Sequence, residues 1–197
     1  MSEQLIISIG REFGSGGHVI AEKLAARFGL ALYDHNLLDE IAQEKELDAE
    51  TLKKYDEVPR NMVFSRTVKG FSSSSEENIA HMQFDFLKRK AAAGESFVVV
   101  GRCAETMLKD YNGLISIFVL GDIPVKTARV MEVYGLREKE ARFKMERHDR
   151  HRKMYHNYYC KGKWGDSRNY DLSINSSRLG IERTVDFLES YIKERQK

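Results

Sequence analysis

A glycine-rich turn between a short apolar run and an apolar-periodic segment constrains the fold more than any other feature. The apolar run covers residues 5–9, and glycines follow at Gly10, Gly14, Gly16 and Gly17. Beyond the turn, apolar residues recur at helical spacing as far as residue 28. A strand, a glycine turn and a helix in this order bring backbone N–H groups together, and the helix N-terminus adds the positive end of its dipole. The sequence therefore predicts a cradle for an anion such as phosphate.

This cradle lacks the two side chains that usually accompany it. Phosphate-binding loops of the form G-x-x-x-x-G-K-[ST] end in Lys and then Ser or Thr, and this chain has Gly17 and His18 there. Arg11 lies in the loop and could face the anion. A tight turn without a ligand is the alternative interpretation. The predicted anion-binding residues are Gly10, Gly14, Ser15, Gly16, Gly17 and His18.

Further apolar runs alternate with helical patterns along the chain. The runs cover residues 31–33, 97–100, 115–120 and 172–174. This alternation predicts an α/β fold with a parallel sheet and helices on both of its faces. Because ligands bind such sheets beyond the carboxyl ends of the strands, the residues that directly follow each run are the candidates for function.

Two charged residues stand at such positions. Asp34 follows the second run, where a carboxylate can hold Mg²⁺, accept a proton or cap the next helix. Arg102 follows a fully apolar run, and its guanidinium fork could grip phosphate with two hydrogen bonds. The alternative for Arg102 is an ion pair with a carboxylate such as Glu105. We interpret the neighbouring Cys103 as a small buried residue rather than a nucleophile.

A polar, basic helix is predicted over about residues 138–159. It carries Arg147, Arg150 and Arg152, which could close over phosphates and neutralise charge in a transition state. A solvated helix face is the alternative, and a nucleic-acid surface is a third interpretation, because tyrosines interleave with the basic residues. The net charge of +2 over 197 residues gives no bulk attraction to nucleic acid, so we expect no such partner.

Cysteine and histidine spacing indicates neither a disulfide framework nor a metal site. The two cysteines, Cys103 and Cys160, form no C-x-x-C pair. His148 and His151 share a helix face, but no third ligand stands at a useful spacing, so we expect no metal-binding residues. No secretory leader and no window of about 18 apolar residues is visible. We therefore expect a cytoplasmic protein with reduced thiols and no membrane partner; the sequence does not indicate its oligomeric state.

Several motifs together resemble the cytidylate kinase-like family of P-loop nucleoside monophosphate kinases. They are Ile-Ser-Ile-Gly-Arg-Glu-Phe-Gly-Ser-Gly-Gly at 7–17, Tyr-Asp at 33–34, Val-Val-Gly-Arg-Cys-Ala-Glu at 99–105, Lys-Trp-Gly-Asp at 163–166 and Tyr-Asp-Leu-Ser-Ile-Asn-Ser-Ser at 170–177. The resemblance covers nearly the whole chain and is weakest over about residues 46–75.

The resemblance implies a single P-loop kinase domain over 1–197 with five parallel strands between two helical layers. It also implies a helical acceptor-binding insert over about 46–93 and a helical lid over about 138–168. The implied reaction moves the γ-phosphoryl group of ATP, with Mg²⁺, to CMP or a similar nucleotide. By the same resemblance, Arg102 grips the acceptor phosphate, the lid arginines reach both nucleotides, and Asp171 meets the acceptor sugar.

Departures from the family of true cytidylate kinases leave the acceptor open. Gly17 and His18 replace the loop lysine and the hydroxyl residue, and Cys103 replaces the aspartate of a Gly-Arg-Asp motif. We expect Arg11 or a lid arginine to supply the charge that the lysine normally gives. Two alternatives follow: a kinase of another small acceptor, and a nucleotide-binding sensor that does not catalyse.

Overall fold

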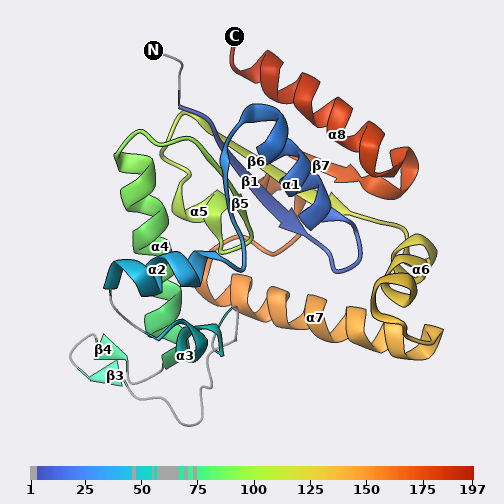
Figure 1. Cartoon of the computed structure of the whole chain (residues 1–197), viewed down its shortest axis with the longest axis horizontal. Coiled ribbons are helices and arrows are strands. Elements are labelled where there is room, and N and C mark those ends of the chain that lie inside the picture. The colour runs from blue at the N-terminus through green and yellow to red at the C-terminus, as the bar shows by residue number, and fades with distance from the viewer. Residues whose placement is uncertain (1–3, 46–47, 55, 57–66, 69–70, 73–74) are drawn as a thin grey trace.

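A five-stranded parallel sheet forms the centre of the computed structural model, which describes residues 4–45, 48–54, 56, 67–68, 71–72 and 75–197. Its strands lie in the order β2-β5-β1-β6-β7 (Figure 1). Their bounds are β1 Ile6–Arg11, β2 Ala31–Tyr33, β5 Phe97–Val100, β6 Leu114–Leu120 and β7 Leu172–Asn175. The predicted α/β fold with five parallel strands is confirmed.

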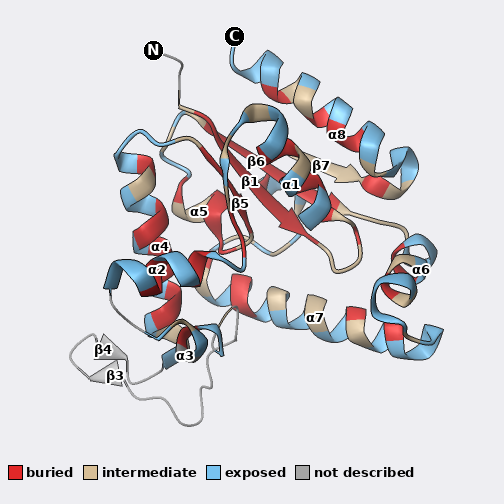
Figure 2. Cartoon of the chain, in the orientation of Figure 1, coloured by how far each residue is buried: buried red, intermediate tan, exposed pale blue. Residues whose placement is uncertain are grey.

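Helices cover both faces of this sheet, as the uninterrupted apolar strands require. The first layer is α1 (Gly17–Phe28) and α8 (Ser176–Arg195), which pack on Ile7 and Ile9 of β1. The second layer packs on Ile6 and contains α2 (Leu37–Lys45), α4 (Ser75–Ala92) and α5 (Ala104–Met107). The buried strands stand out in Figure 2 between partly exposed helices.

Two further helices, α6 (Ile123–Tyr134) and α7 (Glu138–Tyr159), lie outside these layers and contact each other. In Figure 1, α7 extends below the sheet from the side of α4 to the side of α6. A 3₁₀ turn, η1 (Ser167–Asn169), precedes β7. The predicted lid over 138–168 contains α7 and η1, and its role stays a prediction.

The segment between α2 and α4 contains α3 (Ala49–Lys53) and a small antiparallel pair, β3 (Thr67–Val68) with β4 (Phe71–Ser72). Part of the predicted insert over 46–93 lies outside the described residues, and its acceptor-binding role stays a prediction. In the part of the chain that the structure describes, no helix has the length and apolar character needed to cross a membrane.

Candidate functional site

The glycine loop joins β1 to α1 and depends on backbone conformations that glycine adopts freely. Gly14 and Gly16 have φ of 78° and 82°. A Cβ at Gly16 would overlap Cδ1 of Ile181 and lie 3.1 Å from a guanidinium nitrogen of Arg129. The loop is also tied internally, because Ser15 Oγ donates to the backbone oxygen of Glu12 at 2.8 Å. A side chain at Gly16 would therefore collide with residues that pack against the loop.

The glycine at position 17, where a loop lysine is usual, is explained by Arg11. A Cβ on Gly17 would lie 2.6 Å from Cβ of Arg11 and 3.2 Å from its Cγ. The side chain of Arg11 therefore fills the space that a residue-17 side chain would need. Arg11 ends β1, is 6% exposed, and its Nη2 lies 3.7 Å from Oδ1 of Asp34. A cation from the end of β1 thus stands beside the loop.

Asp34 is the buried carboxylate at this edge of the sheet. Its Oδ2 lies 2.6 Å from Nδ1 of the half-exposed His18, and its Oδ1 faces Arg11. The carboxylate therefore holds two groups of the loop rather than capping α2, which begins at Leu37. The predicted candidates Arg11, His18 and Asp34 are brought together here.

A second arginine beside the loop, Arg129 of α6, was not found by sequence reasoning. Its Nη1 donates to the backbone oxygen of Gly14 at 2.6 Å, and burial lowers the pKa of Arg129. The neighbouring Lys126 does not serve as a loop lysine, because its Nζ lies 2.8 Å from Oε2 of Glu12. The position of α6 directly after β6, at the ligand edge of the sheet, is the one sequence signal for Arg129.

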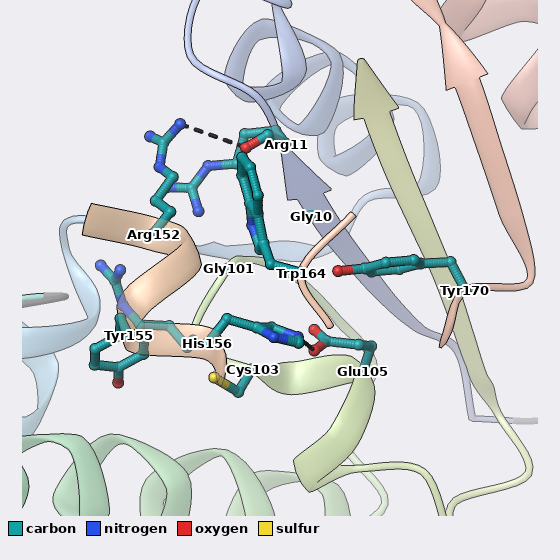
Figure 3. Close-up of a pocket in the computed structure, with 11 residues that line it drawn as sticks. Gly10, Arg11, Gly101, Cys103, Glu105, Arg152, Tyr155, His156, Trp164 and Tyr170 are labelled. Carbon is teal, nitrogen blue, oxygen red and sulfur yellow. Dashed lines mark hydrogen bonds and ion pairs between the residues drawn. The ribbon is translucent and has the colours of Figure 1, made fainter. Parts of the chain in front are cut away.

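The basic helix α7 docks against the glycine loop. The backbone N–H of Phe13 donates to Oδ1 of Asp149 at 2.7 Å. The ring of Phe13 stacks on His148 with centroids 4.4 Å apart and planes at 13°. Nη1 of Arg152 donates to the backbone oxygen of Arg11 at 3.4 Å (Figure 3). One face of α7 therefore closes over the loop.

The three predicted arginines of this helix do not share one location. Arg152 lies at the glycine loop, whereas Arg147 and Arg150 are exposed to solvent. The solvated-face alternative thus describes the latter two in this conformation.

A cavity of about 230 Å³ lies beside the loop and is lined by its glycines together with Arg11, Asp34, Arg129 and Arg152.

The stacked His148 is expected to stay neutral down to acidic pH. Burial, reinforced by the nearby cations Arg152 and Lys144, lowers its pKa to about 4. In the unfolded chain this histidine binds its proton with a pKa of about 6.5. The contribution of neutral His148 to the free energy of unfolding should therefore fall as the pH drops from 6.5 toward 4. NMR titration of the ring protons should give a midpoint close to 4. A midpoint near the ordinary value would contradict the packing of α7 on Phe13.

Arg102 is fully buried at the turn after β5. Its Nη2 donates to Oδ2 of Asp56 at 2.9 Å and to the backbone oxygen of Asp34 at 3.1 Å. The expected ion-pair alternative thus occurs, but with Asp56 instead of Glu105. Asp56 follows α3, so Arg102 joins the sheet edge to the predicted insert. Cys103 is buried, in line with its interpretation as a small interior residue.

Asp171 does not join these residues. It precedes β7 and lies toward the amino end of that strand, whereas the glycine loop follows the carboxyl end of β1. Its Oδ2 accepts from Ser116 N at 2.8 Å and from Ser116 Oγ at 2.9 Å, and its Oδ1 lies 3.4 Å from Arg195. In this structure its carboxylate therefore joins β7 to β6, and the expectation that Asp171 meets the acceptor sugar stays a prediction.

A buried polar cluster lies on the other side of Arg102 and was also missed. Glu105 and His156 are 51 positions apart in the sequence, and His156 Nε2 lies 2.7 Å from Glu105 Oε1. Although burial opposes it, hydrogen bonds to Cys160 and Glu105 raise the pKa of His156. A hydrogen bond with Cys103 lowers the pKa of the Cys160 thiol. The spacing of these residues carries no local pattern by which they could be recognised.

Comparisons with known proteins agree on one family and one fold. A family model described as the cytidylate kinase-like family matches residues 6–178. A protein named cytidylate kinase from Pyrococcus horikoshii is 28% identical, covering 96% of this chain and 89% of the relative. Another of that name from Methanopyrus kandleri is 26% identical, with 97% and 94% covered.

Solved structures show the same architecture. A crystal structure of an uncharacterized protein from Eubacterium ventriosum is 42% identical, with a TM-score of 0.77, and the match covers 96% of this chain and 99% of that one. A shikimate kinase from Bacteroides thetaiotaomicron is 14% identical, with a TM-score of 0.55 and coverage of 96% and 98%. The second likeness concerns the fold alone.

Proposed function

Because the chain belongs to the cytidylate kinase-like family, we propose that it transfers the γ-phosphoryl group of ATP to a nucleoside monophosphate, with CMP as the first acceptor. The family and the kinase fold make it a phosphotransferase. One observation carries the finer proposal: arginines from β1, α6 and α7 meet at the cavity beside the glycine loop. Phosphoryl transfer depends mainly on positioning and on neutralising charge, which such a set of cations supplies.

On the donor side, the glycine loop would hold the phosphates of ATP. Its glycines line the cavity beside the loop, and Arg11 would supply from β1 the charge that a loop lysine usually gives. Arg129 and Arg152 line the same cavity and add charge from α6 and α7. Asp34 is the buried carboxylate in that lining and is the residue we propose to help hold the Mg²⁺ that accompanies ATP.

On the acceptor side, Arg102 would grip the phosphate of the monophosphate. Its buried guanidinium lies next to Asp34 and Asp56, so it is oriented before the acceptor binds. The oxygen of a phosphate acceptor is already anionic and needs no general base. Asp34, which is held between Arg11 and His18, is not required to remove a proton. This arrangement favours a phosphorylated acceptor over a neutral alcohol.

Arg152 should matter more for turnover than other cations of α7. We expect Arg152→Ala to lower kcat by about 10²-fold, because it removes a cation beside the transferring group. Arg142→Ala is the matched control, since Arg142 is exposed on the same helix and pairs with Glu138. Steady-state kinetics with saturating ATP would measure both. Equal losses in the two variants would contradict the placement of Arg152 at the reacting groups.

The proposed reaction is tested by following CDP directly. The purified protein is given MgATP and each of CMP, dCMP, UMP, AMP and GMP, and the products are separated by chromatography. Saturable formation of CDP, faster than formation of the other diphosphates, is the expected result. Release of ADP only with a non-nucleotide acceptor would support the other kinase interpretation. ATP binding by calorimetry without turnover of any acceptor would support the sensor.

A further inference from the structure

Four buried side chains with metal-binding chemistry meet behind the Arg102 turn. Cys103 lies in that turn, Glu105 in α5, His156 in the last turn of α7, and Cys160 directly after α7. Their exposed fractions are 3%, 7%, 4% and 7%. The cavity that borders these residues also reaches Arg11 and Arg152, which line the glycine-loop cavity as well. None of the four residues has a role in the proposed phosphoryl transfer.

The distances between these groups suit one small ion. The donor atoms of Glu105, His156 and Cys160 all lie within 4.8 Å of one another. Oε1 of Glu105 is 2.7 Å from Nε2 of His156 and 4.0 Å from Sγ of Cys160. Cys103 is not a member of this three-residue group. Its thiol hydrogen-bonds with that of Cys160 and would have to move toward Glu105 and His156 to become a fourth donor.

A tetrahedral zinc ion needs separations of this size. Zinc bonds of about 2.0–2.3 Å place neighbouring ligand atoms about 3.3–3.8 Å apart. The distances of 2.7 Å and 4.0 Å from Glu105 Oε1 fall on either side of that range, so small side-chain shifts would bring the donors to coordinating positions. Figure 3 shows the side chains of His156 and Glu105 pointing toward one another.

The kinds of donor atom select the metal. Two sulfurs, one imidazole nitrogen and one carboxylate oxygen suit Zn²⁺, whereas Mg²⁺ and Ca²⁺ prefer oxygen ligands alone. A small cavity of about 20 Å³ borders this interior and is lined by Cys103, Glu105 and His156 together with Arg11, Arg102 and Arg152.

We propose that Cys103, Glu105, His156 and Cys160 bind one structural Zn²⁺ ion that joins the end of α7 to the turn carrying Arg102. All four coordination positions are filled by protein, so the ion has no open position for a substrate. Its effect is mechanical: it fixes the residue next to Arg102 against the basic helix. The proposal does not depend on the identity of the acceptor, and it can fail while the kinase reaction stands.

The test measures metal content rather than activity. The full chain, kept reduced with a phosphine, is incubated with zinc sulfate, freed of unbound metal by gel filtration and analysed by mass spectrometry of elements. We expect one zinc per chain in the natural protein. We expect Cys160→Ser and His156→Gln to lose most of it. His151→Gln, an exposed histidine of the same helix, is the matched control and should keep its zinc.

A second measurement uses the natural protein alone and does not depend on whether a variant folds. Cobalt in place of zinc should give thiolate-to-metal charge-transfer absorption and the visible bands of a tetrahedral ion. Less than half an equivalent of zinc in protein whose two thiols are shown to be reduced would overturn the proposal. Cobalt bands typical of octahedral oxygen coordination, or equal zinc in His151→Gln and His156→Gln, would do the same.

Discussion

Arg11→Gly is expected to lower kcat by about 10²–10³-fold, because it removes the cation that we assign in place of the loop lysine. Glycine is chosen over alanine because Cβ of Arg11 itself would lie 2.6 Å from a Cβ at position 17. The affinity for ATP should fall less than kcat, since a charge that acts on the transferring group is felt most in the transition state. Steady-state kinetics and ATP calorimetry would measure the two quantities.

Substitutions at positions 11 and 17 together test whether the two side chains occupy the same space. Gly17→Lys alone should not raise activity, because the new side chain meets Arg11. Arg11→Gly combined with Gly17→Lys should recover a substantial part of the loss, because the lysine then enters the vacated space. Thermal unfolding followed by circular dichroism controls for folding. Full activity in Arg11→Gly, or higher activity in Gly17→Lys alone, would show that the two positions do not share one function.

Arg102→Lys is expected to have the second large effect. Lysine keeps the charge but loses the planar fork that grips a phosphate with two hydrogen bonds. We expect kcat/KM for CMP to fall by about 10²-fold or more, while KM for ATP changes little. Arg102→Ala is less informative, because breaking a buried ion pair costs about 3–5 kcal/mol of stability.

Two control variants distinguish a role of Arg102 in binding the acceptor phosphate from a role in stabilising the fold. Asp56→Asn removes the charge that faces Arg102 at 2.9 Å but keeps the arginine. If Asp56→Asn loses as much kcat/KM for CMP as Arg102→Lys, the ion pair rather than the guanidinium grip is responsible. Arg27 of α1 pairs with Asp186 and Glu189 of α8. Arg27→Lys should change neither kcat/KM for CMP nor KM for ATP.

Local patterns in the sequence were sufficient for the sheet and the glycine loop. Apolar runs define strands because strands covered on both faces exclude polar side chains, and the loop combines glycines that are adjacent in the chain. The contacts of Arg102 with Asp56 and of Glu105 with His156 bring together distant segments. No spacing rule links such residues, so their partners emerged only from the folded chain.

Which of the three arginines of α7 lies at the glycine loop could be predicted in part from the sequence. Ala141, Met145 and Tyr155 form the buried side of the helix. Arg152 stands three residues before Tyr155 and therefore shares that side, as helical spacing requires. Arg147 and Arg150 do not. The spacing of the buried apolar residues therefore singles out Arg152, but the many basic residues of the helix made this pattern hard to recognise.

Helix α7 contacts the proposed site at two points along its length. Its 22 residues make a rod of about 33 Å. Near its middle, Asp149 grips the backbone of Phe13 in the glycine loop, and at its end His156 grips Glu105 beside the Arg102 turn. Because α7 is one continuous helix, it cannot move away from Phe13 without also straining the contact between His156 and Glu105. In the proposed reaction, a movement of α7 that admits the donor would therefore also disturb the contact beside the Arg102 turn.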